Sequence, residues 1–262
     1  MNRIGGMLRV AIVVGAVLAV WYAGAFLLEA SGDRNAYAKL PYPHAILDKV
    51  LANPGTVIDA TWETASRAVL GFFIGLFVGG LFATLMVQAR ALEVAFLPYV
   101  LASQMVPIIA LVPIMRAILR EPELVRLYLA SYVTFFIITV AVLRGLKSVD
   151  RNALELMASL NAGRATVLRV LRFPAAVPYI FSGMRIAAPL SLIGAILVDL
   201  VSGQGGLGYL MIAAVVVGPS QATLLWAALL IAFALGTLFA RTVVWVERRV
   251  SPWQFALREG ST

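Results

Sequence analysis

Long stretches without a charged side chain are the feature that most restricts how this chain can fold. They cover residues 10–28, 68–89, 94–115, 127–143 and 202–240. An α-helix needs about 20 mostly apolar residues to cross the hydrocarbon core of a bilayer. Charged residues make up only 13% of the chain, against about a quarter in soluble domains. The sequence therefore predicts an all-α, polytopic membrane protein.

The chain is expected to have six spanning helices: the fifth carries Arg185 and Asp199 near its ends, and the sixth begins only after the glycines and Pro219 that break the last uncharged stretch. The expected spans are residues 10–28, 68–89, 94–115, 127–143, 179–201 and 222–246. The first stretch is longer than the apolar part of a signal peptide, about 7–15 residues, so we expect it to be retained. The chain then divides into residues 1–65, the first span with an exposed segment holding one short helix; 66–250, a core of five spans; and 251–262, a tail.

The third expected span is interrupted by Pro98, Pro107 and Pro113, which should kink or unwind it. Broken backbone at membrane depth survives only where protein or a watery cavity surrounds it, so we expect this span to line a pathway. The candidate path or gate residues are Ser103, Gln104, Pro107, Ser191 and Asp199. The serines and the glutamine can equally bond carbonyls freed by proline, and Asp199 can equally be solvated at the membrane interface.

Lysines and arginines gather at the ends of the expected spans. With both termini in the cytoplasm, fourteen of them lie inside and seven outside, as the positive-inside rule requires. The net charge of +8 forms no single soluble basic face, so nucleic acid is not an expected partner. The chain has no cysteine and one histidine, His44, so no metal site is expected. Arg185, in the fifth span, should extend toward the lipid–water interface.

A polar insert, residues 145–178, separates the fourth and fifth spans and should lie in the cytoplasm. Asp150 is a suitable N-cap for a helix starting at residue 151. Asn161 can take the left-handed conformation that ends such a helix, and a second helix, about 164–172, should stop at Pro174. The first helix carries one apolar stripe, namely Leu154, Met157, Ala158 and Leu160. The stripe fits either a groove on a partner protein or the underside of the bundle.

Two glycine patterns have a structural explanation. Gly71, Gly75 and Gly79 recur every four residues, which predicts close helix packing, either within the chain or against a second copy. Residues 203–208 spell GxGxxG but follow a span instead of a strand, so we expect a flexible external turn and no dinucleotide site. The chain also contains no GxxxxGK[ST] motif, and cannot cradle ATP phosphates in that way.

Several segments together resemble the permease subunits of ABC importers, in particular the nitrate, sulfonate and taurine type. In the insert, Glu155, Leu171 and Pro174 match the family's coupling-loop motif, with Asn161 in place of its glycine. Pro107-x-x-Ala110-Leu111-x-Pro113 resembles the family's third-span motif, and the likeness extends over about residues 60–253. By this resemblance, the residues that contact a separate ATPase are Leu154, Glu155, Met157, Ala158, Leu160, Asn161, Ala162, Gly163 and Arg164.

The resemblance implies a type I importer permease in the inner membrane of a bacterium. Two copies, most simply a homodimer, would enclose the path, ABC ATPase subunits would hold ATP and magnesium, and an external or periplasmic binding protein would deliver the solute. This chain would then be no enzyme and carry no cofactor. The implied substrate is a small polar solute of the sulfonate, taurine or nitrate class. Alternatives are a vitamin-like heterocycle, such as a pyrimidine precursor or riboflavin, and a stand-alone secondary carrier.

Overall fold

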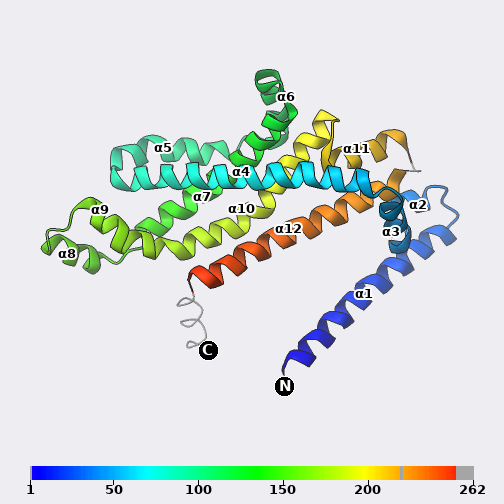
Figure 1. Cartoon of the computed structure of the whole chain (residues 1–262), viewed down its shortest axis with the longest axis horizontal. Coiled ribbons are helices and arrows are strands. Elements are labelled where there is room, and N and C mark those ends of the chain that lie inside the picture. Colours follow the sequence, from blue (N-terminus) through cyan, green and yellow to red (C-terminus); the bar gives the residue numbers. More distant parts are fainter. Residues whose placement is uncertain (1, 219–220, 252–262) are drawn as a thin grey trace.

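A computed structural model describes residues 2–218 and 221–251 of the chain. They form a bundle in which most of the long helices run in roughly one direction (Figure 1). The elements are, in chain order, α1 (Asn2–Ala30), α2 (Ala36–Lys39), α3 (Pro43–Ala52), α4 (Pro54–Gln88), α5 (Arg90–Ser103), α6 (Ile108–Leu119), α7 (Pro122–Lys147), α8 (Arg151–Ser159), α9 (Arg164–Val167), the π-helical turn η1 (Leu168–Arg172), α10 (Phe173–Ser202), α11 (Gly206–Val217) and α12 (Ala222–Val250).

Five of these helices are long and apolar enough to cross a membrane, or six if the bent pair α5–α6 is one span. The all-α, multi-span fold predicted from the uncharged stretches is thereby confirmed. The tail assigned to residues 251–262 lies outside the described residues except for Ser251. Helix α1 stands apart from the bundle along most of its length (Figure 1) and is hardly buried within the chain.

Helix α7 forms the centre of the fold and packs most extensively against α4 and α10. The α4–α7 contact depends on the three regularly spaced glycines, all of which are buried. A Cβ atom on Gly75 would lie 2.5 Å from both the Ser131 carbonyl oxygen and the Thr134 Cβ. The small-residue spacing therefore serves packing within the chain, which answers the choice left open by the sequence.

Prolines begin several helices. Pro43, Pro54 and Pro122 lie in the first turn of α3, α4 and α7, where the missing N–H would have no partner in any case. For this reason the segment from residue 29 to 67 is more ordered than predicted. It contains two short helices, α2 and α3, and its last part already belongs to α4.

The third span is broken more sharply than a kink. Helices α5 and α6 meet at an angle of 102°, and Pro107 is the residue immediately before α6. Proline cannot donate a backbone hydrogen bond and disfavours a helical residue before it. Pro98 and Pro113, in contrast, lie inside their helices. The elbow at residues 104–107 thus separates two helices that the sequence suggested were one.

The predicted stop at Pro174 was wrong. Residues 164–202 form one continuous helical run, in which η1 precedes Pro174 in the first turn of α10. A π-helical turn places one extra residue in the helix, and this accommodates a proline that cannot donate to the turn before it. The run ends at Gly203, which is left-handed with a φ of 62°, as glycine at a helix C-terminus commonly is.

Helix α11 replaces the flexible turn that was predicted around the GxGxxG residues. Gly205 and Gly206 both have positive φ, 60° and 77°, and let the chain reverse sharply after α10. Gly206 is then the first residue of α11. In Figure 1, α11 lies at one end of the bundle together with α2 and α3, whereas α8 and α9 lie at the opposite end. The two ends are called the α11 end and the α8 end below.

Candidate functional site

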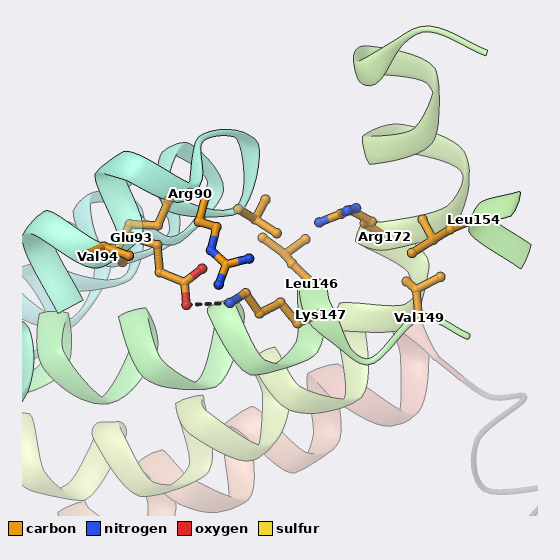
Figure 2. A pocket seen from close by; sticks show the side chains of 10 residues that line it. Arg90, Glu93, Val94, Leu146, Lys147, Val149, Leu154 and Arg172 are labelled. Carbon is orange, nitrogen blue, oxygen red and sulfur yellow. Dashed lines mark hydrogen bonds and ion pairs between the residues drawn. The ribbon is translucent and has the colours of Figure 1, made fainter. Parts of the chain in front are cut away.

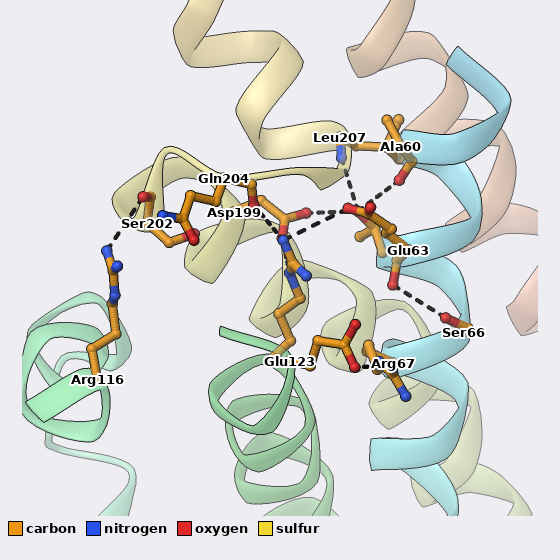
Figure 3. Close-up of polar contacts among 12 residues, drawn as sticks. Ala60, Glu63, Ser66, Arg67, Arg116, Glu123, Asp199, Ser202, Gln204 and Leu207 are labelled. Atoms are coloured by element: carbon orange, nitrogen blue, oxygen red, sulfur yellow. Dashed lines mark hydrogen bonds and ion pairs between the residues drawn. The ribbon is translucent and has the colours of Figure 1, made fainter. Parts of the chain in front are cut away.

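A buried ion pair connects α7 to α10 at the α11 end. The Arg126 Nε donates to the Asp199 Oδ1 over 2.5 Å, and the two side chains are only 5% and 0% exposed. The same guanidinium also donates to the Gln204 carbonyl oxygen in the turn before α11. A third group, the Glu63 carboxylate of α4, lies 3.8 Å away. Arg126 therefore joins α4, α10 and the turn to α11, whose residues Glu63, Asp199 and Gln204 lie near one another in Figure 3.

Thr64 completes this network from α4. Its Oγ1 lies 2.6 Å from the Asp199 Oδ2 and accepts a 2.8 Å hydrogen bond from the backbone N–H of Leu207. The threonine is fully buried, so both contacts are shielded from water and strengthened by the low local dielectric. One hydroxyl thus connects the carboxylate of α10 to the first turn of α11.

The glycines of the turn let α11 approach this carboxylate. A Cβ atom on Gly206 would collide with the Asp199 carboxylate oxygens. On Gly208 it would lie 2.7 Å from both the Asp199 Cβ and the Leu200 nitrogen. The absent side chains are therefore a requirement of the network, not a sign of flexibility. Helix α11 is held against α10 by its backbone.

The interpretation of Asp199 as a solvated interfacial residue was wrong, because a buried arginine neutralises it. The gate interpretation is not tested by this contact. Sequence reasoning missed Arg126, Thr64 and Glu63 as members of a site. Pro122 could have placed Arg126 on a helix, because a helix that begins at Pro122 has Arg126 in its second turn. Nothing in the sequence indicated Thr64.

The other candidate path residues do not form one group. Ser103 and Gln104 line an open cavity of about 230 Å³ beside the elbow, together with Tyr132 of α7, whose hydroxyl donates to the Ser103 carbonyl oxygen. Ser191 is fully buried, and its Oγ donates to the Ala188 carbonyl oxygen. Ser191 therefore bonds a backbone carbonyl, although not the one that Pro189 leaves free, and it does not itself line this cavity.

The apolar residues of α8 divide between two sides of the helix. Leu154 and Met157 are half-buried and turned toward the bundle, with Leu154 lining a cavity there. Leu156 and Leu160 are 61% and 68% exposed and are neighbours at i and i+4. The single predicted stripe was thus wrong in detail, because Leu156 was omitted and Leu154 faces inward. Both interpretations of the stripe, partner groove and bundle underside, apply to different sides of one helix.

The turn after α8 has the predicted geometry. Asn161 has a φ of 53°, and the Ala162 N–H donates to the Met157 carbonyl oxygen over 3.0 Å, which closes the helix end. Asp150 occupies the N-cap position, yet its side chain makes no capping bond. The remaining coupling candidates are exposed or half-buried, namely Glu155, Ala158, Ala162, Gly163 and Arg164.

A second ion pair lies toward the α8 end of the bundle, between α10 and α12. Arg185 Nη2 contacts both carboxylate oxygens of Glu247, which is 3% exposed. This contact does not test the prediction that Arg185 extends to the membrane interface, but the carboxylate partner on the neighbouring helix was not predicted. Among the described residues, no group of three or more histidine, aspartate or glutamate side chains could hold a metal ion.

Several known sequences are similar to this chain. A Haemophilus influenzae protein described as a probable ABC transporter permease is 28% identical, over 93% of this chain and 96% of that protein. A formylaminopyrimidine transport permease of Halalkalibacterium halodurans is 34% identical over 53% of this chain and 56% of its own length. A taurine transport permease of Escherichia coli is 27% identical over 82% of this chain and 80% of its own length.

The fold is shared with solved transporters. A chain in the crystal structure of an amino acid ABC transporter with histidines superposes with a TM-score of 0.64, covering 78% of this chain and 98% of that chain at 18% identity. The apolar helices, the broken span and the exposed helix between spans define a membrane-embedded transport subunit. Residues 71–252 match the family described as binding-protein-dependent transport system inner membrane component, and the chain belongs to this family. It is the permease subunit of an ABC importer.

Proposed function

We propose that two identical copies of this permease enclose a path for a small polar solute of the sulfonate, taurine or nitrate class. An external binding protein delivers the solute. Support comes from the family description, which names a binding-protein-dependent system, and from the similarity to a taurine permease. The similarity to a formylaminopyrimidine permease supports a second candidate substrate, a vitamin-like heterocycle.

The energy for transport comes from separate ATPase subunits that bind ATP and magnesium and dock on α8 and the turn after it. This chain performs no bond chemistry. The observation that carries the docking proposal is the exposed pair formed by Leu156 of the nine-residue helix α8 and Leu160, the residue that caps its C-terminus, between two spans. Two exposed leucines on so short a helix favour a protein groove as their partner. Closure of the ATPases would then move α8 and switch the spans between two arrangements.

In this proposal the α8 end faces the cytoplasm and both termini lie on that side of a bacterial inner membrane. The distribution of lysine and arginine supports this orientation. The α11 end, with its buried network, then faces the binding protein. A cysteine introduced at Asn152 in this cysteine-free chain should react with an impermeant thiol reagent only after the membrane is opened. Reaction in sealed cells would contradict the orientation.

Reconstitution tests the energy source. The permease should co-purify with an ATPase, and proteoliposomes holding both should take up solute only with ATP and the binding protein. Leu160→Asp should abolish ATPase binding and uptake, because it places a charge in the proposed interface. Asn152→Asp, which adds the same charge at an exposed polar position of the same helix, should leave both nearly unchanged. Uptake by the permease alone without ATP would establish a secondary carrier instead.

The substrate class needs its own assay. Unlabelled taurine, an alkyl sulfonate, nitrate and a formylated aminopyrimidine are compared as competitors of uptake in the complete system. Competition by the sulfur or nitrogen oxyanions supports the first class, and competition by the pyrimidine alone supports the second. A system that transports normally but responds to none of them would refute both substrate classes while leaving the importer mechanism intact.

A further inference from the structure

An open cavity of about 490 Å³ lies at the α8 end, between the α4–α5 turn, the end of α7, α8 and η1. Three basic side chains line it from three different elements (Figure 2): Arg90 from α5, Lys147 from α7 and Arg172 from η1. The rest of the lining is largely apolar and includes Leu146 and Leu154. The cavity thus combines basic side chains with an apolar wall, at the level where several spanning helices end.

The charge in this cavity is not balanced by the chain itself. Its single carboxylate, Glu93, forms an ion pair with Lys147. Arg90 and Arg172 make no ion pair or hydrogen bond with any residue that the structure describes, although Arg172 is half-buried. Two positive charges therefore remain. Like charges near a low-dielectric surface repel one another, and an anion between them removes this cost.

A second cavity extends the same basic surface toward the end of α8. It has a volume of about 230 Å³, shares Val87 and Arg172 with the first cavity, and adds Arg164. Arg164 makes no ion pair among the described residues either. The two cavities together present three uncompensated guanidinium groups along one continuous wall, and Arg172 lies at their junction.

The π-helical turn explains why Arg172 is at this junction. Its extra residue offsets the residues before Pro174 from their ordinary helical positions. As a result Arg172, the last residue of η1, lines both cavities, whereas Arg169, three positions earlier, lines neither and is exposed. Such turns occur frequently at functional sites. The local backbone thus directs Arg172, and not Arg169, toward the two cavities.

We propose that this pair of cavities binds a phosphate-type anion, supplied by the headgroup of an anionic phospholipid or by free phosphate. Guanidinium groups suit phosphate because their fixed donors match its oxygens. Basic pockets between spanning helices commonly hold lipid headgroups, and the apolar wall offers a surface for acyl chains. The bound anion connects Arg90 of α5 to Arg172 of η1 and Arg164 of α9, so its occupancy stiffens the attachment of the α8–α9 segment to the bundle.

Lipid binding by the purified full-length permease tests this proposal. Native mass spectrometry in detergent measures retained phosphatidylglycerol and, separately, retained phosphatidylcholine, for the wild type and for Arg90→Gln, Arg172→Gln and the double variant. Arg169→Gln is the matched control, since it removes the same charge from the same turn without touching the cavities. Circular dichroism verifies that all variants are folded. A parallel series adds millimolar inorganic phosphate without lipid and follows the unfolding temperature.

We expect preferential binding of phosphatidylglycerol, weakened about fivefold by each single variant and about 30-fold by the double variant, from roughly 1 kcal/mol per basic residue. Arg169→Gln should bind like the wild type. If inorganic phosphate alone raises the unfolding temperature with the same dependence on Arg90 and Arg172, and lipid does not bind, free phosphate is the source. Equal losses with Arg169→Gln, or unchanged anion binding in the double variant, would overturn the proposal. Loss of ATPase binding without loss of anion binding would also overturn it, in favour of an acidic protein partner.

Discussion

Replacing Arg126 by leucine should cost the permease a large part of its stability. Two unit charges about 2.5 Å apart attract by roughly 7 kcal/mol at an effective dielectric constant of about 20, and much of this offsets the desolvation of both groups. Removing only the arginine leaves Asp199 buried with Thr64 as its remaining side-chain partner. Loss of one partner of a buried pair costs about 3–5 kcal/mol, and we expect a value in this range.

The assay is a denaturant titration in mixed micelles that yields the apparent free energy of unfolding. Arg67→Leu is the control, since its ion pair with Glu123 lies at the same end of the bundle but is 31% and 60% exposed and is worth at most about 1 kcal/mol. Asp199→Asn combined with Arg126→Leu should recover part of the loss, because Asp199 no longer buries a charge that has lost its arginine. Equal effects of the Arg126 and Arg67 variants, or strict additivity in the double variant, would refute the reasoning.

Three further predictions concern packing, the turn after α8 and the second buried pair. Gly75→Ala should destabilise the permease by about 1–3 kcal/mol, because the new Cβ atom would strike the backbone of α7. Gly80→Ala is the control and should be neutral or slightly stabilising, since a Cβ atom there meets nothing within 4 Å. Thermal unfolding compares the two variants, and equal shifts of the unfolding temperature would contradict the proposed contact. Asn161→Gly should keep the turn. Asn161→Val should raise the rate of amide hydrogen exchange in residues 157–162, since the left-handed backbone costs residues other than glycine, asparagine and aspartate about 1–2 kcal/mol. An unchanged exchange rate in the valine variant would argue against this backbone conformation. Glu247→Gln should lower the free energy of unfolding by about 1–3 kcal/mol, because the Glu247 carboxylate is buried against an arginine. Glu155→Gln, on the exposed face of α8, is the control and should change the free energy of unfolding little.

The spans, the close glycine packing and the turn at Asn161 could be predicted because each follows from local rules. A sufficiently long uncharged stretch by itself predicts a helix that crosses the membrane. Glycines spaced four residues apart lie on one face of a helix and predict close packing there. An asparagine after an apolar stripe predicts a left-handed residue that ends the helix. Each of these patterns lies within about twenty residues of sequence. None of them depends on knowing which helices are neighbours.

The buried network could not be predicted because it joins residues from distant parts of the chain. Thr64 and Asp199 are separated by 135 positions, and Arg126 lies just outside the expected span 127–143. Pairing between spans depends on the packing order of the helices, which local patterns do not contain. The same reason explains why the partner of Arg185, which lies 62 positions away, was not predicted. The error at Pro174 differs, since a π-helical turn let a proline continue a helix that it usually stops.

The uninterrupted helical run of 39 residues from Arg164 to Ser202 has a mechanical consequence. At 1.5 Å per residue it is about 58 Å long, and it begins beside α8 and ends at the Asp199 network. A rod of this length moves its far end by about 1 Å for each degree that it tilts about its near end. A small rotation beside α8 would therefore produce a larger displacement at the opposite side of the bundle, as with a lever. Pro178, Pro189 and the π-helical turn are the places where that lever can bend.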